Sequence, residues 1–220
     1  MNRIAKEPFQ FLTRQNLTIL LGRKAKNLNG LLLNIKEVPL SSIYHHTHHY
    51  LEQHEYLSPE PPNDFAYWIT NVLQNDSLGE KIAGIDLRSL DSLEDIRAKL
   101  IEVIENGIMQ DPESAVHNVP AGEEFHFMAA QTFVFPTQYI ARDLKDFKEC
   151  LQEVSIFSIY YHIFEARLFQ QNARFCYWIE NSLDNRKLAD AIKRLDPYTQ
   201  TLDNLRKNLI KIVTMHLEEK

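Results

Sequence analysis

The chain has 220 residues, of which 44% are hydrophobic and 25% charged, the balance of an ordinary soluble globular protein. Its net charge of −6 and its pI near 5.8 argue against nucleic acid as a partner. No apolar run approaches the roughly 20 residues that span a bilayer, so no membrane partner is expected. The cysteines, Cys150 and Cys176, form no Cys-x-x-Cys pair and no signal-peptide pattern is present, which favours the cytoplasm.

The first predicted element is a pair of short strands. Phe9 and Phe11 alternate with other residues and lead into the apolar run 17–20, a pattern typical of a hairpin. A helix is predicted next, because the following apolar residues have helical spacing. These residues are Leu28, Leu31, Leu32 and Ile35.

A histidine-rich helix is predicted to begin near Leu40. Spacings of three, four and seven residues place four polar residues on one face: His45, His48, His49 and Glu52. Histidines four residues apart can aim both imidazoles at one ion, and a carboxylate can be the third ligand. His45, His49 and Glu52 are therefore a candidate site for a divalent transition metal, with His48 as an alternative ligand, although the His-Glu-x-x-His motif is missing.

Two other interpretations of the histidine run stay open. The face can be solvated or lie against another surface, which is the interpretation that the sequence favours. It can also respond to pH or bind anions, since imidazoles titrate near neutrality. His46 lies at the border of the apolar face, where we expect a buried side chain hydrogen-bonded to a backbone carbonyl.

Two further helices complete the first half of the chain. The proline cluster in residues 58–62 predicts a rigid connector. Asn63 and Asp64 are suitable N-caps for a helix over 65–73, whose aromatic residues are expected core anchors. Ser92, with Asp95 three residues later, predicts the start of the last helix by a capping box.

The second half repeats the first in the same order. Ser42-Ile43-Tyr44-His45-His46 returns as Ser158-Ile159-Tyr160-Tyr161-His162, and Phe65-Ala66-Tyr67-Trp68-Ile69 returns as Phe175-Cys176-Tyr177-Trp178-Ile179. Phe9 and Phe11 correspond to Phe125 and Phe127. We predict a mainly helical α+β fold of two tandem repeats, each a short strand pair followed by four to five helices. Residues 1–108 form the first repeat, 109–122 a linker and 123–220 the second repeat. The structural signature of the repeat is His46, Phe65 and Trp68, with His162, Phe175 and Trp178.

These motifs resemble an uncharacterised family of bacterial and archaeal cytosolic proteins that carry a domain of unknown function. The matching pattern is Ser-Ile-x-x-His, then Asp/Arg-Phe-x-x-Trp-Ile. In the first half it consists of Ser42, Ile43, His46, Asp64, Phe65, Trp68 and Ile69; in the second half, of Ser158, Ile159, His162, Arg174, Phe175, Trp178 and Ile179. The resemblance spans nearly the whole chain and implies no activity, cofactor or catalytic residue.

Catalytic motifs are missing from the sequence. It contains no glycine-rich phosphate loop, no Gly-x-Ser-x-Gly elbow and no catalytic residue that a motif identifies. We therefore favour a non-enzymatic module that binds a protein or a small molecule in a cleft between the two repeats. The alternative is a metal-dependent enzyme of hydrolase type that uses the histidines of the first repeat.

Overall fold

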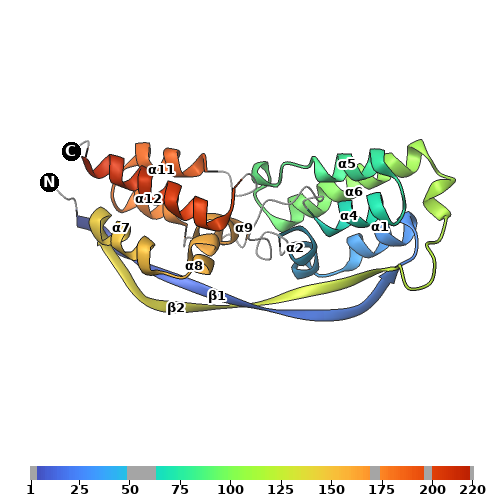
Figure 1. Cartoon of the computed structure of the whole chain (residues 1–220), viewed down its shortest axis with the longest axis horizontal. Helices are drawn as coiled ribbons and strands as arrows, with labels where there is room; N and C mark the ends of the chain where they lie inside the picture. The colour runs from blue at the N-terminus through green and yellow to red at the C-terminus, as the bar shows by residue number, and fades with distance from the viewer. Residues whose placement is uncertain (1–3, 49–62, 169–173, 196–199, 219–220) are drawn as a thin grey trace. The chain divides into compact units, whose positions relative to one another are not determined.

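The protein is an α+β protein in which helices predominate (Figure 1). The computed structural model describes residues 4–48, 63–168, 174–195 and 200–218. Two long strands, β1 (Ile4–Ala25) and β2 (Phe125–Asp143), pair in a two-stranded sheet. None of the described helices combines the length and the apolar character needed to cross a membrane.

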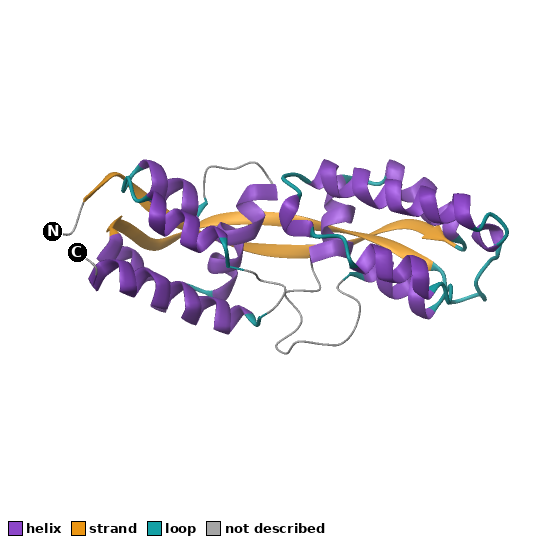
Figure 2. Cartoon of the chain, turned by 90° about the horizontal axis from the view of Figure 1, so that it is seen from above, coloured by secondary structure: helices purple, strands orange, loops and turns teal. Residues whose placement is uncertain are grey.

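The chain forms two compact units, and each strand contributes to both. Unit 1 consists of the described residues within Met1–Gln15 and Thr132–Lys220. Unit 2 consists of the described residues within Asn16–His54 and Ser58–Gln131. Within each unit, the helices lie over one face of the strands (Figure 2).

Unit 2 contains five of the described α-helices. They are α1 (Leu28–Glu37), α2 (Leu40–His48), α4 (Asp64–Asn71), α5 (Asp76–Ala83) and α6 (Leu93–Gln110), with short 3₁₀ turns at Leu87–Ser89 and Ser114–Val116. Unit 1 contains α7 (Leu144–Glu153), α8 (Ile156–Tyr160), a π-helical turn η3 (Tyr161–Glu165), α9 (Ala166–Leu168), α10 (Phe175–Asn181), α11 (Arg186–Lys193) and α12 (Leu202–Glu218).

The short strand pair expected in each repeat is wrong for the described residues. Each strand continues through the segment where the hairpin would turn, and β1 pairs with β2 instead of with itself. The physical reason is local. Residues 12–16 and 128–131 contain no glycine, the residue that the commonest two-residue hairpin turns use, so the straight strand is favoured.

Phenylalanines at corresponding places anchor the strands in the two cores. In unit 1, the Phe9 ring lies 5.4 Å from those of Phe175 and Trp178. In unit 2, the Phe125 ring lies 5.2 Å from that of Phe65. The half of each strand that opens a predicted repeat therefore packs on the helices that the sequence assigned to the other repeat.

Helix starts agree with the predicted caps. The Asn63 side chain accepts a hydrogen bond from Ala66 N at the start of α4, and Ser92 accepts one from Asp95 N at the start of α6. Ser92 Oγ also donates to an Asp95 carboxylate oxygen at 2.7 Å, which holds the capping hydroxyl in place.

Candidate functional site

Helix α2 in unit 2 is polar in sequence but buried. His45, His46 and His48 are exposed to only 4%, 1% and 1%, respectively. The interpretation of this helix face as solvated is therefore wrong for His45 and His48. The helix packs against both α4 and α6, so its polar side chains lie inside the unit.

Two hydrogen bonds fix the His46 ring. Its Nε2 accepts from the backbone N–H of Met128 on β2 at 3.0 Å, and its Nδ1 lies 2.8 Å from Asp64 Oδ2 at the start of α4. A ring nitrogen that accepts a hydrogen bond carries no proton, so the proton of the neutral ring is on Nδ1. This Nδ1–H group donates a hydrogen bond to the Asp64 carboxylate. The burial predicted for His46 is confirmed, but its backbone partner is an N–H group and not a carbonyl.

One group of potential metal ligands emerges in the described part of the chain. One atom each of His45, His46 and Asp64 lies within 4.8 Å of the others. A histidine ligand must offer a lone pair, and both His46 nitrogens are already used. Metal binding here would therefore depend on His45 and Asp64, with His46 orienting the carboxylate.

The metal ligands predicted from the sequence, His45, His49 and Glu52 with His48 as an alternative, are not the residues of this group, apart from His45. His49 and Glu52 lie outside the described residues, so their pairing with His45 stays a prediction. His48 Nδ1 is 2.7 Å from Thr47 Oγ1, and the His48 ring stacks on Tyr44 at 5.4 Å. Thr47 in turn donates to the carbonyl of Ile43, so His48 belongs to an internal hydrogen-bond chain.

Unit 1 reproduces the strand contacts of unit 2. His162 Nε2 accepts from the backbone N–H of Leu12 on β1 at 2.7 Å, as His46 does from β2. The indole of Trp178 donates to the carbonyl of Glu7 at 2.7 Å, and that of Trp68 donates to Glu123 at 2.8 Å. Both tryptophans are 5% exposed, so they are core anchors as predicted. The same prediction is wrong for Tyr67 and Tyr177, which are 48% and 43% exposed.

The two units differ beside these contacts. Unit 1 contains a buried ion pair between Arg14 of β1 and Glu165 at the end of η3, with side-chain exposures of 2% and 0%. The Arg14 guanidinium also lies 5.2 Å from the centre of the Tyr160 ring. The pKa of Tyr161 is raised, mainly because the hydroxyl is buried and to a smaller extent because Glu165 is negatively charged. Sequence patterns do not predict this pair. The one sign of it in the sequence is a charged residue, Arg14, within a predicted strand that has core residues such as Phe11.

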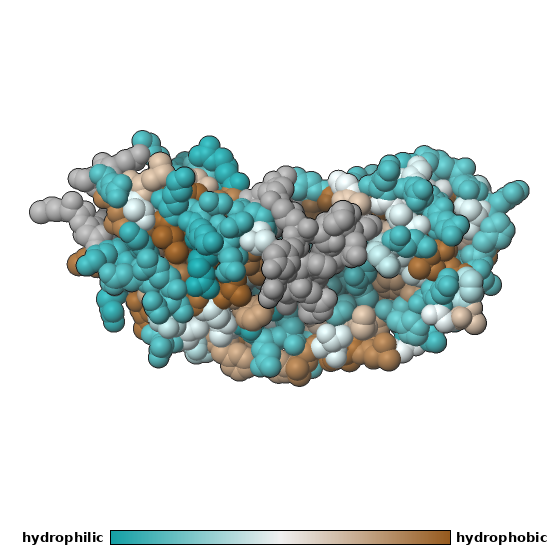
Figure 3. Space-filling view, viewed as in Figure 1, coloured by the Kyte–Doolittle hydropathy of each residue, from teal (hydrophilic) through white to brown (hydrophobic). Residues whose placement is uncertain are grey.

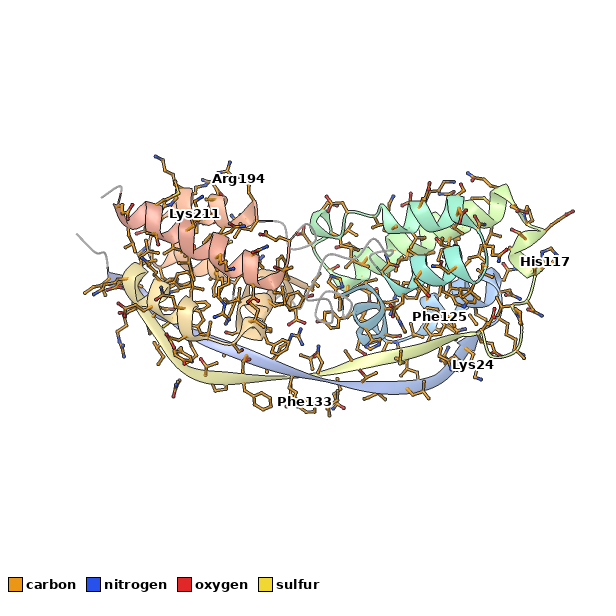
Figure 4. All side chains as sticks on the ribbon, in the orientation of Figure 1. Lys24, His117, Phe125, Phe133, Arg194 and Lys211 are labelled. Atoms are coloured by element: carbon orange, nitrogen blue, oxygen red, sulfur yellow. The ribbon has the colours of Figure 1, made fainter. Side chains whose placement is uncertain are left out.

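The strands also carry exposed apolar runs. In unit 1, Phe133, Val134 and Phe135 of β2 are exposed to 39%, 38% and 47%. In unit 2, Leu17, Ile19 and Leu20 of β1 are exposed to 50%, 42% and 64%. Figure 4 shows the Phe133 side chain pointing away from the helices, whereas Phe125 points toward them. Hydrophobic residues also gather along the surface where β1 and β2 run (Figure 3).

The comparisons with known proteins establish the family. The model of a family of unknown function, DUF5752, matches residues 6–214. The chain belongs to DUF5752. This agrees with the resemblance to an uncharacterised family.

A solved structure supports the fold of this DUF5752 member. It is similar to OrfY from Thermoproteus tenax, with a TM-score of 0.83 and 26% sequence identity over 97% of each chain. No curated protein matches the chain.

Proposed function

We propose that this DUF5752 member is a non-enzymatic interaction module that binds a protein partner through the exposed runs of its strands. One observation carries the proposal: three consecutive residues, Phe133–Phe135, are all exposed and all apolar. Successive side chains of a strand point to opposite faces, so the described residues cover neither face at this point. Exposed apolar surface of this kind marks binding sites more often than scattered single residues do.

The shape of the surface favours a protein over a small molecule. A two-stranded sheet has an unpaired edge on each strand, and an extended segment of a partner can pair with such an edge. Apolar side chains beside the edge add contact area. The sequence also favoured a cleft between the repeats, and that location stays a prediction.

We further infer that the units descend from one repeated sequence, with residues 1–108 and 123–220 as the copies. The matched histidine and tryptophan contacts support this inference. So do Arg97 and Arg206, which donate to the carbonyls of Val38 and Val154 at the ends of α1 and α7. The strands would then be exchanged between the copies. The free thiols of Cys150 and Cys176 support a reducing, cytoplasmic location.

The test changes the exposed run without changing its strand propensity. Phe133, Val134 and Phe135 are replaced together by threonine, and cell proteins captured by the variant are compared with those captured by the native chain. The control replaces Met109 and Met215, which are 70% and 51% exposed on helices, by glutamine. We expect a partner that the native chain and the control retain and the threonine variant loses. Identical captured proteins from all three chains would contradict the proposal.

Metal binding is the second candidate, and the closeness of His45 to Asp64 is the observation that favours it. In the hypothesis of a metal-dependent enzyme, the ligands of the ion are His45, His49 and Glu52, as predicted from the sequence. Elemental analysis of untagged protein, purified without nickel resin, tests both ligand sets. Stoichiometric metal that His45→Ala removes would support the candidate. If the native protein is folded and contains no metal, this candidate is excluded.

A further inference from the structure

The two units receive their strands through the same features. Each docked segment offers two phenylalanines separated by one residue, a backbone N–H for a histidine and a carbonyl for a tryptophan indole. In β1 the phenylalanines are Phe9 and Phe11, with the N–H of Leu12 and the carbonyl of Glu7. In β2 they are Phe125 and Phe127, with the N–H of Met128; the carbonyl is that of Glu123, two residues before the strand. These contacts alone therefore do not distinguish one strand from the other.

A folded-back arrangement would satisfy the same contacts. If each strand formed the hairpin that the sequence pattern predicts, Phe9 and Phe11 would dock on unit 2 in the place of Phe125 and Phe127. The lack of glycine in residues 12–16 and 128–131 disfavours this hairpin without forbidding it. Something further must favour the observed arrangement.

The strands differ in charge three residues after the second phenylalanine. Arg14 occupies this place in β1 and Ala130 occupies it in β2. Arg14 pairs with Glu165, and both side chains are almost completely buried. Arg14 also contacts aromatic rings, with its guanidinium 5.2 Å from Tyr160 and 6.0 Å from Phe157.

The described part of unit 2 offers Arg14 no partner equivalent to Glu165. None of its described residues is a buried aspartate or glutamate. By the repeat, the position of Glu165 corresponds to position 49, where the sequence has a histidine. In the folded-back arrangement, Arg14 would meet no buried carboxylate among the described residues of unit 2, and Ala130 would leave Glu165 in unit 1 without the cation that pairs with it.

We propose that the Arg14–Glu165 ion pair determines which unit receives the first half of β1. An isolated buried charge is far more costly than a paired one, so the folded-back form is penalised at two places. A buried ion pair adds little stability over apolar residues of similar volume, and its best-attested role is to select one arrangement among several. The pair therefore acts on specificity of docking more than on stability.

The test replaces both charges by apolar residues of similar size, Arg14→Met with Glu165→Leu. The two tryptophans report the docking, because the Trp178 indole is bonded to Glu7 in β1 and the Trp68 indole to Glu123, two residues before β2. In the native protein, the nitrogen-15 spectrum should contain one indole signal for each tryptophan. The double variant should fold and give a second pair of signals from the folded-back form.

A spin label identifies that second form. It is attached at His126→Cys, an exposed residue of β2, in a background with Cys150→Ala and Cys176→Ser. In the observed arrangement, the label lies three residues from Glu123, the partner of Trp68, and should broaden the Trp68 signal. In the folded-back form, it should broaden a Trp178 signal.

Two control variants separate docking from general loss of stability. Lys36→Met with Glu105→Leu removes an exposed ion pair of unit 2 and should keep a single signal for each tryptophan. The double variant Arg14→Gln with Glu165→Gln replaces both charged side chains by neutral polar ones. It is measured in place of the Arg14→Met and Glu165→Leu variant if that variant does not fold. If a folded variant without either charge keeps one native signal for each tryptophan, the proposal is overturned.

Discussion

The histidine contacts to the strands give the sharpest prediction about stability. Replacing His162 by phenylalanine keeps an aromatic ring among Phe9 and Phe175, whose centres lie 4.8 and 4.9 Å away, but removes the acceptor for Leu12 N. Leaving a fully buried donor without its partner costs about 1–3 kcal/mol. Leu12 is only partly buried, so the expected cost is near the lower end, about 1 kcal/mol. We therefore expect His162→Phe to lower the free energy of unfolding of unit 1 by this amount.

His46→Phe should lower the stability of unit 2 similarly, although His46 also bonds to Asp64. The Asp64 side chain is 43% exposed, so water replaces its lost hydrogen bond. Asp64→Asn alone should therefore cost less than about 1 kcal/mol.

Urea unfolding followed by fluorescence measures both effects. The single-tryptophan variants Trp68→Phe and Trp178→Phe separate the signals of unit 1 and unit 2. An unchanged midpoint for His162→Phe would refute the reasoning about the Leu12 donor. Equal losses for Asp64→Asn and His46→Phe would show instead that the main role of His46 is to hold Asp64.

Three further predictions concern single residues. Gly79→Ala should destabilise unit 2 by about 1–3 kcal/mol, because the added Cβ overlaps Thr70 Oγ1; thermal unfolding measures the loss, and Thr70→Ala should recover part of it. Ser92→Ala should cost about 1 kcal/mol through loss of the cap on Asp95 N, seen as a lower urea midpoint. Burial raises the pKa of Cys176 to about 11, so its alkylation in the folded protein should be slow at neutral pH and accelerate as the pH rises toward 11; fast alkylation at pH 7 would contradict this. Because the folded pKa is raised from 9.0, the stability contributed by the protonated thiol should be lost between pH 9 and about 11, and Cys176→Ser should remove this part of the pH dependence.

The proposed interaction surface and the proposed role of the ion pair concern different parts of the strands. Phe133–Phe135 and Leu17–Leu20 are exposed, whereas Arg14 is buried beside them in the chain. The contrast has a simple physical origin. Where helices cover the strand, its buried side chains need apolar or hydrogen-bonding partners. Where the strand is uncovered on both faces, nothing within the described chain buries the apolar side chains. A partner that covers the exposed runs would remove this apolar surface from water.

Local features of the sequence determined much of the fold. The α+β class, the caps at Asn63 and Ser92, and the burial of both tryptophans follow from residue spacing and capping chemistry, which act over a few neighbouring residues. The alternation at Phe9 and Phe11 also predicted a strand correctly.

Tertiary structure alone decided which surfaces these elements meet. Spacing placed His45 and His48 on one face of a helix, but the neighbouring helices decided that this face is buried. Spacing likewise identified the strand at Phe9 but not its partner, since pairing joins residues more than a hundred positions apart. The Arg14–Glu165 pair is the extreme case, because a charge in a strand shows no partner until the fold brings a carboxylate to it.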